Sequence, residues 1–170
     1  MADIVVETGA GLSSATSYCS EDDADSYHEN RLHSTVWTGA SSDDKEAALV
    51  WATRLLDEQV VWNGFKKTSA QALAWPRSYV YDREGYLVSS SIVPTAVKNA
   101  TAELARYLIS SDRTSETNAD LAGFKSLKVG PLEMTLDKSS KLPTIPKSVW
   151  SMISVYGINM RRRKKTLVRM

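Results

Sequence analysis

The stretch "TGASSDDKEAALVWATRLLDEQVVW", residues 38–62, predicts the clearest helix of the chain. Ser41 or Ser42 can cap its first free amides. Apolar side chains then recur at helical spacing, which gives the helix one face suited to burial. We expect Trp51 and Leu55 to lie at the centre of the core, and the following Asn-Gly pair to end the helix because it readily takes the left-handed conformation.

Three other segments carry helical signals. A continuous apolar stripe runs through residues 94–110, which begin with a proline suited to a first helical turn. Residues 20–33 begin with a serine cap followed by three acids, and residues 146–157 begin with a proline and end with a glycine. Between the segments 94–110 and 146–157, apolar and polar side chains of residues 124–136 alternate imperfectly around a Gly-Pro pair. This pattern suggests a small β-hairpin or two short edge strands.

The sequence therefore predicts a mainly α fold: a small helical bundle with a short β-hairpin or edge strands and extended N- and C-terminal arms. A length of 170 residues with 42% hydrophobic and 24% charged residues fits one globular domain. We expect an N-terminal arm at 1–19, a helical domain with β decoration at 20–136, and a C-terminal docking segment with a basic tail at 137–170.

No segment resembles a leader or a membrane span. The longest apolar run, "AALVWA" at 47–52, is far too short to cross a bilayer. The only cysteine is Cys19, which excludes an internal disulfide and a thiolate metal cage. We expect a protein kept soluble in a reducing compartment, with no membrane partner.

Few side chains are suited to catalysis, and we expect no enzyme, no cofactor and no metal. His28 and His33 lie about 140° apart on a helix and would not share a metal. Cys19 is expected to be a half-buried thiol beside a surface histidine. The acids of the segment 21–29 fit helix capping better than a cation site, and the early "TGAGLSS" lacks the residues of a phosphate loop.

The basic tail, residues 161–170, holds six of the 21 basic residues and no acid. The remaining 160 residues hold 15 basic and 20 acidic residues, so a net charge of −5 precedes a tail of +6. Three interpretations stay open: nucleic-acid phosphates, an acidic protein surface, or a solvated end. The protein surface is favoured because Leu167, Val168 and Met170 add apolar contacts.

An aromatic loop, "LAWPRSYVYDREGYLV" at 73–88, matches neither a normal helix nor a normal strand. It lies in the stretch "QALAWPRSYVYDREGYLVSSSIVPTAVKNATAELARYL", residues 71–108, which resembles a family of tailed-phage proteins labelled DnaT-like ssDNA-binding proteins. The N-terminal "IVVETGAGLSSATSYCSEDDADSYH", the helix "DKEAALVWATRLLDEQVVWNG" and the later "KSLKVGPLEM" agree with it. The resemblance covers residues 3–136 and leaves out the basic tail.

The resemblance implies a structural virion protein without catalytic activity. Members of this family are similar in fold and genomic role to the head-to-tail connector, or adaptor, of the phage neck. Such adaptors form a homo-oligomeric ring, a dodecamer, under the portal protein and join it to a downstream neck or tail protein. We accordingly expect a protein made in the host cytoplasm and placed in the neck between capsid and tail, with transient contact with the passing dsDNA.

The connector hypothesis assigns two sets of binding residues. Contacts between neighbouring copies in the ring are expected from rigid aromatic and charged residues of the loop: Trp75, Arg77, Tyr79, Tyr81, Arg83 and Tyr86. For Trp75, covering the gap between the two core helices is an equal alternative. Portal contacts are expected from the last helix, whose apolar residues are equally suited to core cover, and from the tail: Trp150, Met152, Ile153, Tyr156, Arg161, Arg162, Arg163, Lys164 and Lys165.

The rival hypothesis is a single-stranded-DNA-binding module. Such modules present aromatic stacking platforms in a basic groove. The aromatic loop instead carries two arginines against one aspartate and one glutamate, and the body is net acidic. On charge, the sequence favours the connector.

Overall fold

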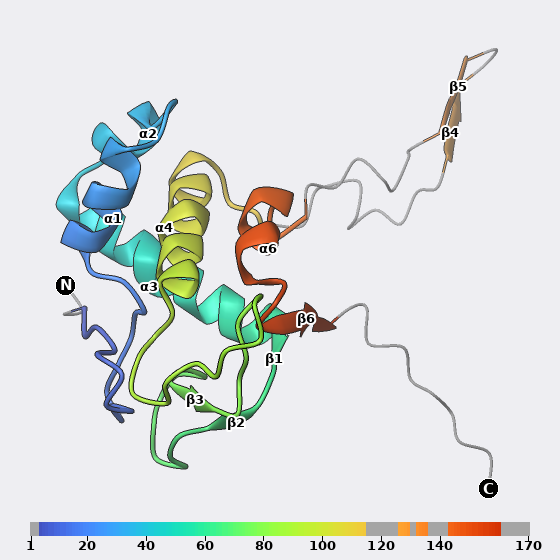
Figure 1. Cartoon of the computed structure of the whole chain (residues 1–170). Helices are drawn as coiled ribbons and strands as arrows, with labels where there is room; N and C mark the ends of the chain where they lie inside the picture. The colour runs from blue at the N-terminus through green and yellow to red at the C-terminus, as the bar shows by residue number, and fades with distance from the viewer. Residues whose placement is uncertain (1–3, 115–125, 130–131, 136–142, 161–170) are drawn as a thin grey trace, which may run out of the picture.

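The computed structural model describes residues 4–114, 126–129, 132–135 and 143–160. Its core is built from three helices: α3 (Ser42–Gln59), α4 (Thr95–Ser110) and α6 (Lys147–Ile153). Helix α4 packs against both α3 and α6, and Figure 1 shows α4 and α6 side by side in front of α3. The predicted mainly α fold with small β elements is confirmed.

Helix α3 starts as predicted, with the Ser41 hydroxyl accepting a hydrogen bond from the Asp44 amide at 3.2 Å. Leu49, Leu55 and Leu56 are buried along one stripe, but Trp51 is 36% exposed. Its position lies roughly 100° around the helix from the centre of that stripe. The expectation that Trp51 is central core was therefore wrong, while Leu55 is a core residue.

The end of α3 differs from the prediction because the chain changes to a strand before the Asn-Gly pair. Strand β1 (Val60–Trp62) pairs antiparallel with β6 (Gly157–Asn159), with Val60 opposite Asn159. Gly157 thus opens a strand instead of closing α6. A Cβ at this glycine would lie 2.7 Å from Val60 Cγ1 and 2.8 Å from the Val61 carbonyl oxygen, so only glycine lets the two strands approach.

The helix predicted over 20–33 is shorter, α1 (Glu21–Glu29), and it is followed by a separate short helix that was not predicted, α2 (Thr35–Thr38). Ser20 caps α1 through the Asp23 amide at 3.0 Å, as expected. The chain then turns through His33, which has a φ of 60°. His28 is buried rather than on the surface, and its ring packs 4.8 Å from that of Trp37.

The N-terminal segment is not a free arm over its described part, residues 4–19. Tyr18 and Cys19 lie in the core, and the Tyr18 amide donates to Thr53 Oγ1 of α3 at 3.2 Å. The fully buried Glu7 carboxylate accepts hydrogen bonds of 2.8–2.9 Å from the amides of Gly9, Gly11 and Leu12. The chain's own carboxylate therefore fills the glycine loop that the sequence already excluded as a phosphate site.

Two further strand pairs complete the described structure. Strands β4 (Ser126–Val129) and β5 (Leu132–Thr135) pair antiparallel, so the predicted hairpin is confirmed. Strands β2 (Phe65–Lys66) and β3 (Arg77–Ser78) form a short antiparallel ribbon that was not predicted. No helix among the described residues is long and apolar enough to cross a membrane.

Burial of Cys19 makes the stability of the fold sensitive to alkaline pH. Desolvation, with a smaller contribution from Asp23, raises the pKa of its thiol from 9.0 to about 12. The folded pKa lies above the unfolded one, so this stability is complete below pH 9 and is lost as pH rises towards 12. Between pH 8 and pH 10 we expect the wild type to lose about 1.4 kcal/mol more unfolding free energy than Cys19→Ala. Urea unfolding of both proteins at the two pH values measures this difference, and equal losses would contradict it.

Candidate functional site

The aromatic loop is fixed to the core by a buried arginine. The Arg77 guanidinium donates hydrogen bonds to the carbonyl oxygens of Asn63 at 2.6 Å, Gly64 at 2.8 Å and Ala74 at 3.0 Å. These bonds tie the turn between β1 and β2 to the start of the loop. Arg77 is only 9% exposed, so its expected role in a contact between copies was wrong.

The buried Tyr18 and the partly buried Asp57 form a pair that holds the other side of the loop. Tyr18 Oη donates to Asp57 Oδ1 at 2.5 Å, and the Ala74 amide donates to Asp57 Oδ2 at 2.8 Å. The Trp75 amide donates to Tyr18 Oη at 3.2 Å. Burial raises the pKa of Asp57 and raises the pKa of Tyr18 well above its usual value. The pair acts as a structural clamp, since both groups are enclosed and satisfied.

Trp75 lies inside the protein. Its ring is fully buried and packs edge-to-face on Trp62 at 5.8 Å and on Tyr156 at 5.7 Å. Of the two roles weighed for Trp75, core packing is the one observed, and contact between copies was wrong because a side chain without exposed surface has none to offer a neighbour. Trp75 and Arg77 thus hold the loop against the core, and they do not belong to its exposed surface.

Four aromatic rings of this region face solvent, and we call them the aromatic ribbon: Phe65, Tyr79, Tyr81 and Tyr86. Their exposed fractions are 71%, 71%, 55% and 73%. The rings of Phe65 and Tyr79 lie edge-to-face, 6.4 Å apart across β2 and β3. Sequence reasoning found the three tyrosines and missed Phe65, which joins them only through the β2–β3 pairing.

Tyr79 is held in an unfavourable backbone conformation. Its φ is 59°, in the left-handed region that bulky residues rarely adopt. The flanking residues Ser78 and Val80 are anchored by β3 pairing and by burial, and they hold this conformation in place. Such strain commonly occurs at functional positions.

The turn that carries Tyr86 is ordered by one carboxylate. Asp82 Oδ1 accepts hydrogen bonds from the amides of Glu84 at 3.0 Å and Tyr86 at 2.8 Å. The backbone also bridges Tyr81 to Leu87. The rings of Tyr81 and Tyr86 are therefore displayed from a preformed turn, and Asp82 is occupied within it.

The exposed cations nearest in sequence to the aromatic ribbon are Lys66, Lys67 and Arg83. Lys67 Nζ donates to the Gly9 carbonyl oxygen at 3.0 Å, which ties the residue after β2 to the N-terminal segment. Arg83 was predicted as a contact and is at the surface. The carboxylates of Glu7 and Glu103 are buried and bonded within the fold, so they add little negative charge to the surface.

The predicted portal residues divide between the core and the undescribed tail. Ile153 and Tyr156 are buried, and Trp150 and Met152 are half-buried against the same cluster. Core cover therefore accounts for Ile153 and Tyr156, which offer little surface to a partner. Five predicted residues lie outside the described part of the chain: Arg161, Arg162, Arg163, Lys164 and Lys165.

A family model described as "Putative DnaT-like ssDNA binding protein" matches residues 2–167. No curated protein and no solved structure matches the chain. The family description agrees with the rival hypothesis, so the expectation of a connector ring was wrong. The charges counted against the rival hypothesis were those of the loop and of the body, and this count took no account of which aromatic rings are exposed for stacking. The portal and neck partners, expected with the connector, gain no support.

Proposed function

Since the chain belongs to the DnaT-like ssDNA-binding family, we propose that it binds single-stranded DNA and that the aromatic ribbon is its stacking platform. The observation that carries the proposal is the exposure of Phe65, Tyr79, Tyr81 and Tyr86 on a rigid support. Soluble proteins seldom leave four large rings in solvent on neighbouring strands and turns without a partner to cover them.

Stacking on these rings gives affinity without sequence preference. Every base has a π-face, and a base stacked on an aromatic side chain contributes about 1–3 kcal/mol. Duplex DNA keeps its bases stacked on one another, so the ribbon discriminates in favour of single strands. The anchors Arg77 and Asp57 hold the rings before DNA arrives, which reduces the entropy lost on binding.

Phosphate contacts are assigned to the exposed cations beside the ribbon and to the basic tail. Lys66, Lys67 and Arg83 flank the rings along the chain, and residues 161–165 supply five further cations. Electrostatic binding of this kind is independent of base sequence and weakens as salt rises. Of the three interpretations of the tail, the proposed function favours nucleic-acid phosphates.

The proposal is tested by fluorescence anisotropy with a labelled 16-nucleotide DNA strand of mixed sequence. The strand is used alone and annealed to its complement. We expect the single strand to bind at least tenfold more tightly than the duplex at the same salt concentration. Equal affinity for the two forms would identify a general polyanion binder, and no binding of either at low salt would reject the proposal.

Salt dependence measures the share of the tail in binding. Replacing Arg161, Arg162, Arg163, Lys164 and Lys165 by serine removes up to five phosphate contacts. For a single strand, the slope of log affinity against log salt should become less steep by up to about 3.5. Replacing Lys45 and Arg54 by serine serves as the control, because Lys45 pairs with Asp25 and Arg54 pairs with Glu58 on another part of the surface. If the slope of log affinity against log salt is unchanged in the tail variant, the tail makes no phosphate contacts. The cations beside the aromatic ribbon then make all of them.

A further inference from the structure

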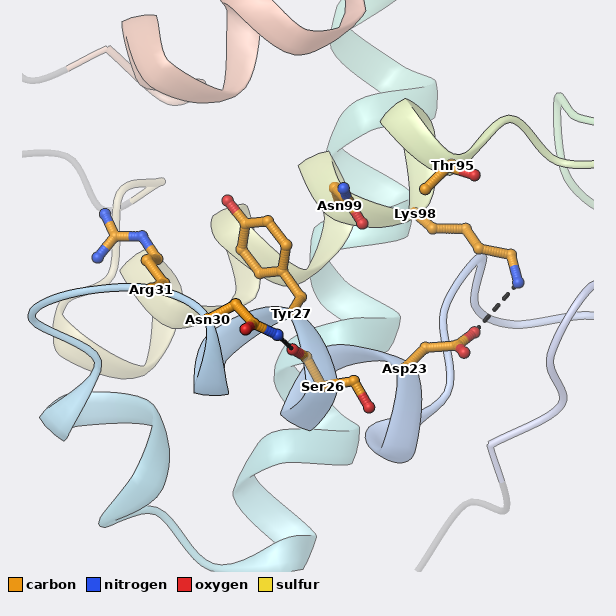
Figure 2. A pocket seen from close by; sticks show the side chains of 8 residues that line it. All are labelled: Asp23, Ser26, Tyr27, Asn30, Arg31, Thr95, Lys98 and Asn99. Atoms are coloured by element: carbon orange, nitrogen blue, oxygen red, sulfur yellow. Dashed lines mark hydrogen bonds and ion pairs between the residues drawn. The ribbon is translucent and has the colours of Figure 1, made fainter.

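A polar groove of about 540 Å³ lies between helices α1 and α4. Figure 2 shows Tyr27 and Asn99 between Arg31 on one side and Lys98 on the other. Its volume falls within the range typical of small-ligand pockets. The residues that line it come from α1, from the turn after it and from the first two turns of α4: Asp23, Ser26, Tyr27, Asn30, Arg31, Thr95, Lys98 and Asn99.

Both cations that line the groove are already held in ion pairs. Lys98 Nζ lies 3.1 Å from Asp23 Oδ2, and Arg31 Nε lies 2.7 Å from Glu103 Oε2. Arg106 also contacts Glu103 at 2.9 Å. A phosphate would therefore have to displace an ion pair, whereas an uncharged polar group would not.

The half-buried Asn99 side chain supplies an unused amide. Among the described residues its side chain has no hydrogen-bond partner, although the residue lies in a regular helix. An amide offers one donor beside one acceptor, which matches the edge of an unpaired nucleobase. Tyr27, whose hydroxyl donates to Glu103 Oε2 at 3.4 Å, adds a half-buried ring next to it.

We propose that this groove takes one unpaired base of the bound strand, with Asn99 pairing to the base edge and Tyr27 contacting the base. The inference rests on the proposed function and adds a second element to it. The aromatic ribbon holds bases by stacking, and the groove reads one base by hydrogen bonds.

The chain places the groove within reach of the ribbon. Val88 bonds back to Val80 at 2.8 Å, and Thr95 at the start of α4 follows it by seven residue steps. A fully extended chain of that length spans at most about 25 Å. Sites for single strands usually cover about 4–16 nucleotides per module, so one strand can occupy both elements.

Two substitutions at Asn99 test the proposal. Asn99→Ala removes both hydrogen-bonding groups and has a higher helix propensity, so α4 is expected to stay folded. Asn99→Asp keeps the shape of the side chain, but its carboxylate can only accept hydrogen bonds. Among the bases, guanine alone presents two adjacent donors, N1–H and N2–H, on its pairing edge, so the carboxylate should favour guanine. Binding is measured with two 12-nucleotide thymine strands that are not self-complementary, one carrying two adenines (the TA strand) and one carrying two guanines (the TG strand). Melting temperatures are recorded for each protein. Ser110→Ala, at the opposite end of α4, is the matched control.

We expect Asn99→Ala to weaken binding of both strands about tenfold. Asn99→Asp should raise the ratio of TG to TA affinity about tenfold relative to wild type. Wild-type affinities in both Asn99 variants, or weaker binding with an unchanged ratio in Asn99→Asp, would overturn the groove as a base site while single-strand binding stands. If the wild type binds neither strand, the proposed function and this inference fall together.

Discussion

Replacing Arg77 by methionine is expected to lower the free energy of unfolding by about 3–5 kcal/mol. Methionine fills similar space, but it leaves the carbonyl oxygens of Asn63, Gly64 and Ala74 without the donors that now reach them at 2.6–3.0 Å. A hydrogen bond from a charged donor contributes about 1.5–3 kcal/mol, and these three bonds are partly buried, so water replaces them only in part. Urea unfolding followed by circular dichroism measures the loss.

Arg83→Met is the matched control for that substitution. Arg83 is exposed on the turn of the aromatic loop, and surface changes of this kind usually stay within about 0.5 kcal/mol. If the Arg77 and Arg83 variants unfold at the same urea concentration, the guanidinium bonds do not hold the loop, and the rigid support assigned to the aromatic ribbon is wrong.

Tyr79→Asn is expected to weaken single-strand binding by about 5–150-fold, the equivalent of one stacked base. The same change should leave stability unchanged or raise it, because asparagine tolerates the left-handed conformation that Tyr79 adopts at φ 59°. Anisotropy titrations measure the affinity for single-stranded DNA, and thermal unfolding of the same preparation measures the stability. Loss of binding without loss of stability separates a binding role from a structural one.

An exposed aromatic residue away from the ribbon provides the comparison. Trp51 is 36% exposed on α3, and Trp51→Gln is expected to bind DNA as the wild type does. A matching loss in both variants would mean that the ribbon has no special part in binding. A fall in melting temperature on Tyr79→Asn would show that the ring stabilises the fold.

The helices were predictable because their signals are local. Ser20 and Ser41 cap α1 and α3 as expected, and Pro94 and Pro146 directly precede α4 and α6. The errors came where distant segments decide the outcome. Strand β1 replaces the last turn of the predicted helix because β6, almost a hundred residues later, pairs with it.

The candidate site was predictable only in part for the same reason. The tyrosines at 79, 81 and 86 were visible in one short stretch, whereas Phe65 and Asn99 reach their places through strand pairing and helix packing. The buried positions of Trp75 and Arg77 also depend on remote groups, since Tyr18 and Asp57 organise the loop around them. The residue types marked the loop as unusual, but only the fold shows which of its side chains are buried and support it and which are exposed for binding.

The pairing of β1 with β6 also places the last described residues, which precede the basic run in the chain, beside β1. Val60 lies opposite Asn159, so the described chain ends one residue beyond a point fixed to β1, and Phe65 follows Val60 by only five residues, at most about 18 Å. Under the proposed function, a strand stacked on the ribbon meets residues 161–165 as a tethered partner at an effective concentration near the millimolar range. Two individually weak contacts then act with avidity, while either one can release and rebind without loss of the DNA.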